Sequence, residues 1–369
     1  MKATLQAARV KFLEQSLNNK NLGIYIHIPF CLTKCGYCDF YSFSPKNVEM
    51  DLFCDKIINE INRWSDNLCR SADSLYIGGG TPSVLGTERL NKIITHATKK
   101  FNIKGEITVE CNPCDNIDFS SLPANRLSFG LQSFNDNELT ALNRRHNSQQ
   151  ANQTFLKAKK HFKNISLDVM LGIPYQTKES LKRTLDFCID LDIPHISTYM
   201  LKIEKNTPFY RSSLPFLNED ETCDLYLFTC EYLKAHGYER YEISNFSKKG
   251  FESKHNLKYW LGADYLGLGP AAHSRIDNKR FYYDRDFKAY LKHPREIYEG
   301  EAGSLEENIM LCLRTNIGFN FKDYPKIKNT ASRLAKNGLI YYNNDVITLT
   351  DKGALLENAI IAELINNLF

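Results

Sequence analysis

The chain has 369 residues, 43% of them hydrophobic and 24% charged, and its formal net charge is +4 at pH 7. This composition is typical of a soluble globular protein with a sizeable core, and so small a net charge argues against a nucleic-acid partner. No run approaches eighteen apolar residues, and the first twenty residues lack the apolar core and cleavage site of a secretory signal, so we expect a cytoplasmic protein without a membrane span.

Between residues 23 and 204, short β-forming runs alternate with segments of helical period. The expected strands are 24–28, 74–78, 106–110, 126–130, 166–171 and 195–201. The expected helices are 48–64, 87–101, 152–162 and 178–191, in which apolar residues recur every three or four positions. Parallel strands joined by helical crossovers form right-handed units, and six units fall short of the eight in a closed barrel. The pattern therefore predicts an α/β fold with a partial (β/α)6 barrel.

The remaining segments predict three further units. Residues 1–22 form an N-terminal helical extension, and 205–292 form a mixed, aromatic-rich extension of the barrel. A polar linker is expected at 292–303, before a mostly helical C-terminal domain over 293–369. In that domain, two β-forming runs flank Asn343, Asn344 and Asp345, which is typical of a hairpin and suggests a small winged-helix-like module.

Every unusual motif of the barrel follows the C-terminal end of an expected strand. In chain order these motifs are "CLTKCGYC", "GGGTP", "ECNP", "GLQSF" and "GIP", the last after a strand that contains Asp168, while the sixth strand ends near Tyr199. In parallel α/β barrels this end of the strands carries the active site. We therefore expect the motifs to meet in one functional site.

Three of the eleven cysteines, Cys31, Cys35 and Cys38, are spaced C-x3-C-x2-C in the first of these loops. Without a secretory signal, thiols remain available for metals or catalysis. A loop of this spacing suits thiolate ligation of an iron–sulfur cluster, whereas a structural zinc site would need a fourth cysteine or histidine close by. Three thiolates on a four-iron cluster would leave one iron open to an exchangeable ligand. Zinc or incidental thiols remain the alternatives.

This motif, with the aromatic Tyr37 before its last cysteine, resembles the radical S-adenosylmethionine (SAM) superfamily. The order "YIHIPFC", "GGGTP", "VECNP", "GLQSF", "NRRH", "LDVMLGIP" and "HNLKYW", over about residues 25–274, resembles the oxygen-independent coproporphyrinogen III oxidases and the related HemW-type haem chaperones. The resemblance implies a [4Fe-4S] cluster on Cys31, Cys35 and Cys38. Its open iron would bind the amino and carboxylate groups of SAM, and an electron donor would reduce it.

The resemblance also implies the residues that hold SAM. Glycines such as Gly79 and Gly80 let the backbone approach a ligand, and with Thr81 they match positions near the SAM amino group. The Glu110 carboxylate is suited to accept hydrogen bonds from a ribose or an amine. The positions that match SAM contacts are Gln132, Arg144 and Asp168, and those that would frame the cluster are Tyr25 and Tyr37. Arg144 and Arg145 are expected on a helix, and spacing favours Arg144 for the pocket.

Two features separate the chaperones from the oxidases. The oxidases are typified by the longer motif C-x3-C-x2-C-x-C, and in this sequence Phe40 occupies the position of the additional cysteine. The segment "HNLKYW" fits the H-N-x-x-Y-W motif of the HemW type. His255 is therefore a candidate haem ligand, Tyr259 and Trp260 would pack on the porphyrin, and His273 is a second candidate.

The resemblance thus implies a haem chaperone that carries a [4Fe-4S] cluster and SAM, and that passes haem to an unidentified acceptor protein. The alternative is an enzyme that catalyses the oxidative decarboxylation of coproporphyrinogen III. Phe40 and the short segment before the first strand argue against this alternative. A radical SAM methyltransferase is a third possibility, but no additional cysteine motif or cobalamin-binding segment supports it.

Overall fold

The computed structural model of the chain describes residues 22–368. Its centre is a curved sheet of six parallel strands in the order β1-β2-β3-β4-β5-β6. The strands are β1 Leu22–Ile28, β2 Ala72–Gly79, β3 Glu106–Cys111, β4 Arg126–Gln132, β5 Ile165–Leu171 and β6 His195–Met200. All six coincide with the expected strands, and the (β/α)6 partial barrel is confirmed.

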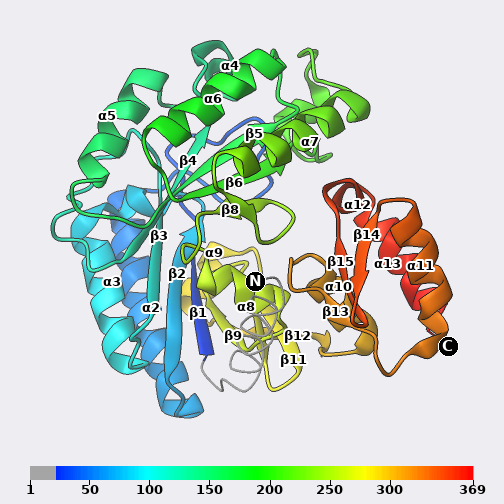
Figure 1. Cartoon of the computed structure of the whole chain (residues 1–369). Coiled ribbons are helices and arrows are strands. Elements are labelled where there is room, and N and C mark those ends of the chain that lie inside the picture. The colour runs from blue at the N-terminus through cyan, green and yellow to red at the C-terminus, as the bar shows by residue number, and fades with distance from the viewer. Residues whose placement is uncertain (1–21, 369) are drawn as a thin grey trace.

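Helices follow the strands and cover the outer side of the sheet (Figure 1). They are α2 Asn47–Leu68, η1 Pro82–Leu85, α3 Gly86–Lys100, α4 Asp136–Ala141, α5 Ser148–Ala158, α6 Lys178–Asp190 and α7 Glu219–Ala235. In α2, the spacing of Phe53, Ile57 and Ile61 places all three side chains on one buried stripe. The helical period therefore indicated which helix face packs on the sheet.

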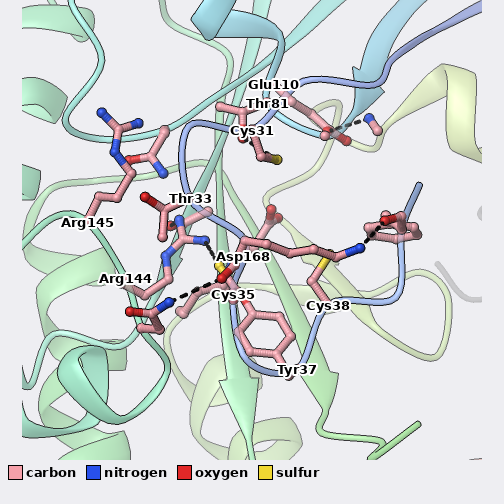
Figure 2. Close-up of a pocket in the computed structure, with 18 of the residues that line it drawn as sticks. Cys31, Thr33, Cys35, Tyr37, Cys38, Thr81, Glu110, Arg144, Arg145 and Asp168 are labelled. Atoms are coloured by element: carbon pink, nitrogen blue, oxygen red, sulfur yellow. Dashed lines mark hydrogen bonds between the residues drawn. The ribbon is translucent and has the colours of Figure 1, made fainter. Parts of the chain in front are cut away.

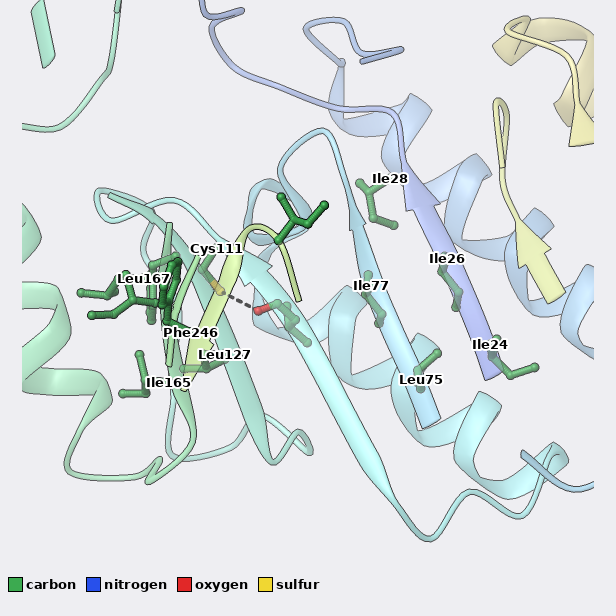
Figure 3. Close-up of a cluster of buried hydrophobic side chains, with 14 of the residues drawn as sticks. Ile24, Ile26, Ile28, Leu75, Ile77, Cys111, Leu127, Ile165, Leu167 and Phe246 are labelled. Carbon is green, nitrogen blue, oxygen red and sulfur yellow. Dashed lines mark hydrogen bonds between the residues drawn. The ribbon is translucent and has the colours of Figure 1, made fainter. Parts of the chain in front are cut away.

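Alternation along each strand separates two kinds of interior. Ile24, Ile26 and Ile28 of β1 are buried together with Leu75 and Ile77 of β2 in the layer under the helices (Figure 3). The residues between them, such as Tyr25, His27 and Tyr76, point into the barrel, because successive side chains of a strand face opposite ways. One face of the sheet thus makes the apolar core and the other a polar barrel interior.

Further strands extend this sheet at both edges, so that the sheet has twelve strands within residues 22–368. At one edge, β8 Asn245–Ser247 pairs antiparallel with β6 and is followed by β7 Glu239–Arg240. At the other edge, β9 Tyr265–Leu268 pairs parallel with β1, and then come β10 His273–Ile276, β11 Lys279–Tyr283 and β12 Glu296–Glu301. Short helices α8 Lys254–Trp260 and α9 Phe287–Lys292 lie between these strands in the sequence.

The prediction of a linker at 292–303 is wrong. Half of this segment forms β12, which pairs with β11 from Glu296↔Tyr283 to Glu301↔Lys279. The polar composition was misleading because β12 is the edge strand of the sheet, and its residues are half-buried or exposed. Whether a domain boundary falls at 292/293 therefore stays a prediction, as do the other boundaries, and residues 1–21 lie outside the described part of the chain.

The C-terminal segment contains α10 Leu305–Leu313, β13 Phe319–Asn320, η3 Pro325–Ile327, α11 Lys328–Lys336, β14 Ile340–Asn343, β15 Val346–Leu349, α12 Asp351–Leu355 and α13 Glu357–Asn366. The expected hairpin is present, since β14 pairs antiparallel with β15. Asn344 and Asp345 both have positive φ, at 50° and 61°, as a tight two-residue hairpin turn requires. β13 adds a third strand, which completes a small sheet with helices beside it.

Candidate functional site

The loops that follow the barrel strands enclose a cavity of about 410 Å³ (Figure 2). The predicted site residues that line it are Cys31, Cys35, Tyr37, Cys38, Gly79, Gly80, Thr81, Glu110, Gln132, Arg144 and Asp168. Tyr25 is not among the lining residues. It lies on β1 inside the barrel, where its hydroxyl hydrogen-bonds with Nδ1 of His27 at 3.0 Å.

The cysteine loop is held at both ends by its own backbone. The Cys31 N–H donates to the Phe43 carbonyl at 3.0 Å, and the Phe43 N–H donates to the Pro29 carbonyl at 3.0 Å. At the middle of the loop, the Phe209 ring from η2 Pro208–Arg211 lies against Gly36, so close that a Cβ there would lie 2.3 Å from a ring carbon. The glycine therefore lets Phe209 pack onto the loop that carries the thiols.

The three thiols border the same cavity and each is partly exposed. Cys31 Sγ lies 3.3 Å from the Thr81 hydroxyl, and Cys35 Sγ accepts a hydrogen bond from Arg144 Nη1 at 3.3 Å. Burial raises the pKa of the Cys38 thiol to about 11. Across residues 22–368, no three His, Cys, Asp or Glu side chains are already gathered into a metal site. The sulfurs would therefore have to turn toward a shared centre.

The glycine loop after β2 packs directly on the cysteine loop. The Gly80 N–H donates to the Ile28 carbonyl at 2.8 Å, and the Thr81 N–H donates to the Phe30 carbonyl at 2.7 Å. A Cβ on Gly80 would lie 2.6 Å from the Phe30 carbonyl oxygen. A Cβ on Gly79, whose φ is +107°, would lie 2.5 Å from the His27 ring. These glycines thus allow close approach of two protein loops.

Arg144 enters the cavity from a loop, which corrects the expected helix, because α4 ends at Ala141 and α5 begins at Ser148. Its Nη2 donates to the Gly130 carbonyl at 2.6 Å, while its buried Nε has no partner in the described structure. Arg145 instead pairs with Asp115 at 2.8 Å. A buried guanidinium without a carboxylate partner favours an anionic ligand beside it.

Two carboxyl groups lie deeper in the same cavity. Glu110 accepts hydrogen bonds from the Tyr76 hydroxyl at 2.7 Å and from the Gly79 N–H at 3.1 Å. Burial raises the pKa of Glu110 to about 7 and that of Asp168 to about 6. Both groups can therefore change protonation near neutral pH, and a bound cation would favour their ionised forms.

The residues of the H-N-x-x-Y-W motif lie outside this cavity. His255 on α8 is fully buried, with Nδ1 2.9 Å from the Ser74 hydroxyl and Nε2 2.9 Å from the Tyr259 hydroxyl. Trp260 packs under the Arg314 guanidinium at 4.5 Å. In this structure neither His255 nitrogen is open to a haem iron, because each is within hydrogen-bond distance of a hydroxyl group.

His273 is the more accessible histidine of the two candidates. Its side chain on β10 is 53% exposed, and its Nδ1 lies 3.2 Å from a Glu299 carboxylate oxygen. The ring stacks on Tyr282 of the neighbouring strand, with centroids 5.1 Å apart. His273 does not line the cavity either, so the structure gathers the predicted SAM residues but not the haem candidates.

Sequence reasoning missed several lining residues, namely Thr33, Lys34, Asn112, Ser128, Asn143 and Met170. Strand alternation could have found Ser128, since it lies two residues before Gly130 on β4 and faces the same side. Phe40, noted only as a departure from the oxidases, also lines the cavity and is 61% exposed. It therefore stands at the cavity's opening to solvent.

Comparison with known proteins agrees with this geometry. The Radical SAM superfamily model matches residues 25–188. The chain is 32% identical to the heme chaperone HemW of Bacillus subtilis (strain 168), over 93% of this chain and 99% of that protein. It is 33% identical to the HemW of Haemophilus influenzae, over 92% and 97% of the two chains. The chain belongs to the HemW family.

A solved structure extends the comparison to the fold. The coproporphyrinogen III oxidase HemN of Escherichia coli, described as a radical SAM enzyme, superposes with a TM-score of 0.78 at 21% identity, and the match covers 96% of this chain and 92% of that one. The resemblance to the radical SAM superfamily is therefore confirmed, and with it a scaffold for a [4Fe-4S] cluster and SAM. None of the helices within residues 22–368 is both long and apolar enough to cross a membrane.

Proposed function

We propose that the protein is a haem chaperone, which binds haem, carries a [4Fe-4S] cluster and SAM, and transfers haem to an acceptor protein. The observation that carries this proposal is the match to HemW chaperones over more than nine-tenths of both chains. An electron donor for the cluster and a cytoplasmic location are part of the proposal. The free cysteines of the described structure suit a reducing compartment.

The cavity fits the two cofactors on chemical grounds. Cys31, Cys35 and Cys38 would ligate three irons of the cluster, since thiolates are the protein ligands that iron–sulfur clusters use. The Arg144 guanidinium, whose Nε has no partner in the described structure, would face the negative charge of the cluster and of the SAM carboxylate. When bound, the pair of cofactors would supply one-electron chemistry at the open iron.

The remaining lining residues would hold the rest of SAM. Glu110 and Asp168 would accept hydrogen bonds from its amino group or ribose, and Gln132, buried at the end of β4, would add an amide. The backbone of Gly79, Gly80 and Thr81 would form the wall next to the cysteine loop. These residues would bind and orient SAM and exclude water from its reactive end.

The affinity for SAM should rise with pH between about 6 and 8 in the wild type. Because burial raises the pKa of Glu110 to about 7, much of this carboxyl is protonated at pH 6 and offers no negative charge to the N–H groups of the SAM amine. The ionised fraction, and with it the affinity, should grow as pH passes the pKa and then level off. Equilibrium dialysis with anaerobic protein measures this.

Glu110→Gln should bind SAM more weakly and with a flatter pH profile, since an amide does not titrate in this range. Glu252→Gln is the matched control, because this half-buried carboxyl lies outside the cavity lining, and it should keep the wild-type profile. A wild-type affinity that does not change from pH 6 to 8 would contradict the placement of Glu110 beside the SAM amine.

His273→Ala should weaken haem binding and shift the visible spectrum of the complex. Among the described residues Nε2 of His273 has no hydrogen-bond partner, and a carboxylate on Nδ1, as Glu299 provides, is the arrangement that orients histidine ligands of metals. Titration with haem, followed by absorbance, measures the change. His236→Ala, at the exposed C-terminal end of α7, is the control. Unchanged affinity and spectrum would exclude His273.

The function itself is tested with anaerobically reconstituted protein divided between two assays. One portion is titrated with haem, and the other receives coproporphyrinogen III, SAM and a reductant. Stoichiometric haem binding without decarboxylated porphyrin supports the chaperone. Formation of protoporphyrinogen IX would instead support the oxidase, and would show that Phe40 does not exclude that reaction.

A further inference from the structure

Helix α8, which carries the H-N-x-x-Y-W motif, packs on the beginnings of the barrel strands. Glu106, the first residue of β3, accepts hydrogen bonds from the N–H groups of Lys254 and His255 at 3.1 and 3.0 Å. The Ser253 side chain caps the same helix by accepting from the Asn256 N–H. Since the cysteine and glycine loops follow the ends of the strands, α8 closes the opposite end of the barrel.

The His255 side chain extends from α8 into the barrel. It hydrogen-bonds with Ser74 of β2 and stacks on the Tyr76 ring, with centroids 5.3 Å apart and an interplanar angle of 28°. Space for the imidazole comes from Gly23 of β1, where a Cβ would lie 3.3 Å from Cε1 of His255. The ring is thus fixed by two hydrogen bonds and by a flat aromatic contact, and it leaves Tyr76 little freedom to tilt.

Tyr76 connects this ring to the cavity. Its hydroxyl donates to Glu110 Oε1 at 2.7 Å, and the other oxygen of that carboxyl accepts from the Gly79 N–H. A Cβ on Gly78 would lie 2.7 Å from a Tyr76 ring carbon and 2.8 Å from Glu110 Oε1, so the missing side chain permits this contact. A continuous series of contacts therefore runs from His255 through Tyr76 to Glu110.

A second contact with the cavity comes from the next residue of the motif. Asn256 lines a polar cavity of about 40 Å³, together with Tyr76, Glu110, Asp168 and Tyr199. Glu110, Asp168 and Tyr199 also line the large cavity, so the two cavities share a wall. A space of this size holds about one water molecule. Asn256 of α8 therefore shares the wall of this small cavity with the two carboxyl groups.

We propose that His255 is a positioning residue for the SAM pocket, which sets the orientation of the Glu110 carboxylate through the ring of Tyr76. This inference rests on the proposed SAM site. It gives the H-N-x-x-Y-W motif a role in the binding of SAM. A change in α8 would alter the wall that holds the SAM amino group, so displacement of His255 and binding of SAM would be coupled.

The experiment measures SAM affinity by equilibrium dialysis in anaerobically reconstituted full-length protein, with iron content and haem titration in parallel. Tyr76→Phe keeps the ring but removes its hydrogen bond to Glu110, and should weaken SAM binding about tenfold, the factor that 1.4 kcal/mol of binding free energy represents. His255→Gln removes the stacked ring and should weaken it by a similar factor. Tyr226→Phe is the matched control, because it removes a buried hydroxyl that donates to the Ile243 carbonyl.

The SAM affinity of the double variant His255→Gln/Tyr76→Phe should be at most about twofold below that of the single variant with the lower affinity. The reason is that both substitutions act through the same contact of Tyr76 with Glu110. All variants should retain their iron. Unchanged SAM affinity in iron-replete Tyr76→Phe, or haem loss with unchanged SAM affinity in His255→Gln, would overturn the inference while leaving the chaperone proposal in place. Wild-type protein that retains haem and iron but binds no SAM would overturn the SAM site and this inference together.

Discussion

Replacement of Cys35 by serine should abolish the visible absorbance of the protein after anaerobic reconstitution and reduce its bound iron close to zero. Cys35 is the proposed ligand that Arg144 contacts, at 3.3 Å from sulfur to Nη1. A serine hydroxyl is a harder and far weaker donor to iron than a thiolate. With only Cys31 and Cys38 left in the loop, a four-iron cluster would lose one of its three protein anchors.

The control for this substitution is Cys69→Ser. Cys69 is exposed at the C-terminal end of α2, remote from the cavity lining, so its variant should take up iron as the wild type does. Iron content and absorbance of the two variants are compared after identical reconstitution. Full iron retention by Cys35→Ser would remove this residue from the ligand set and reopen the alternative of incidental thiols.

Gly80→Ala should lower the free energy of unfolding by roughly 3 kcal/mol, in the upper range for single substitutions, and should impair cluster assembly. The added methyl group would lie 2.6 Å from the Phe30 carbonyl oxygen and 2.8 Å from that of Ile28. Both are backbone atoms that cannot turn away, and the Gly80 N–H donates to one of them. Relief of the clash must separate the glycine loop from the cysteine loop.

The matched control is Gly338→Ala, at a φ of +72° with no atom within 4 Å of the added Cβ. It should cost only about 1 kcal/mol, the strain of a left-handed backbone for a residue with a side chain. Urea denaturation of the cluster-free proteins gives both free energies, and iron uptake is measured separately. Equal destabilisation by the two substitutions would show that the two loops tolerate separation.

The sequence predicted those features that depend on local pattern. Phe53, Ile57 and Ile61 repeat at helical spacing, and the motifs follow strand ends, so both the barrel and the members of its cavity could be expected. Arg144 and Arg145 both line the cavity, but Arg145 is paired with Asp115 whereas the Nη1 of Arg144 points to Cys35. Whether Arg144 contacts SAM stays a prediction.

The features that the sequence could not supply depend on long-range contacts. His255 was predicted as a haem ligand because nothing near it in the sequence reveals that Ser74 and Tyr76 of a distant strand contact its imidazole. The polar residues of β12 read as a linker because an edge strand exposes much of its side-chain surface. Arg144 lies in a loop because α4 is only six residues long. The charged residues around Arg144 in the sequence did not indicate so short a helix.

The pairing of β1 with β9 has a consequence for how the protein forms during synthesis. Gly23 and Tyr265 are register partners, so the first strand of the barrel lacks one neighbour until most of the chain has left the ribosome. Until then, β1 presents an unpaired edge of the kind that promotes aggregation, immediately before the loop of thiols. Such a distant pairing is slow to close. Cluster insertion during translation would thus precede completion of the sheet, whereas insertion after release would meet a finished barrel.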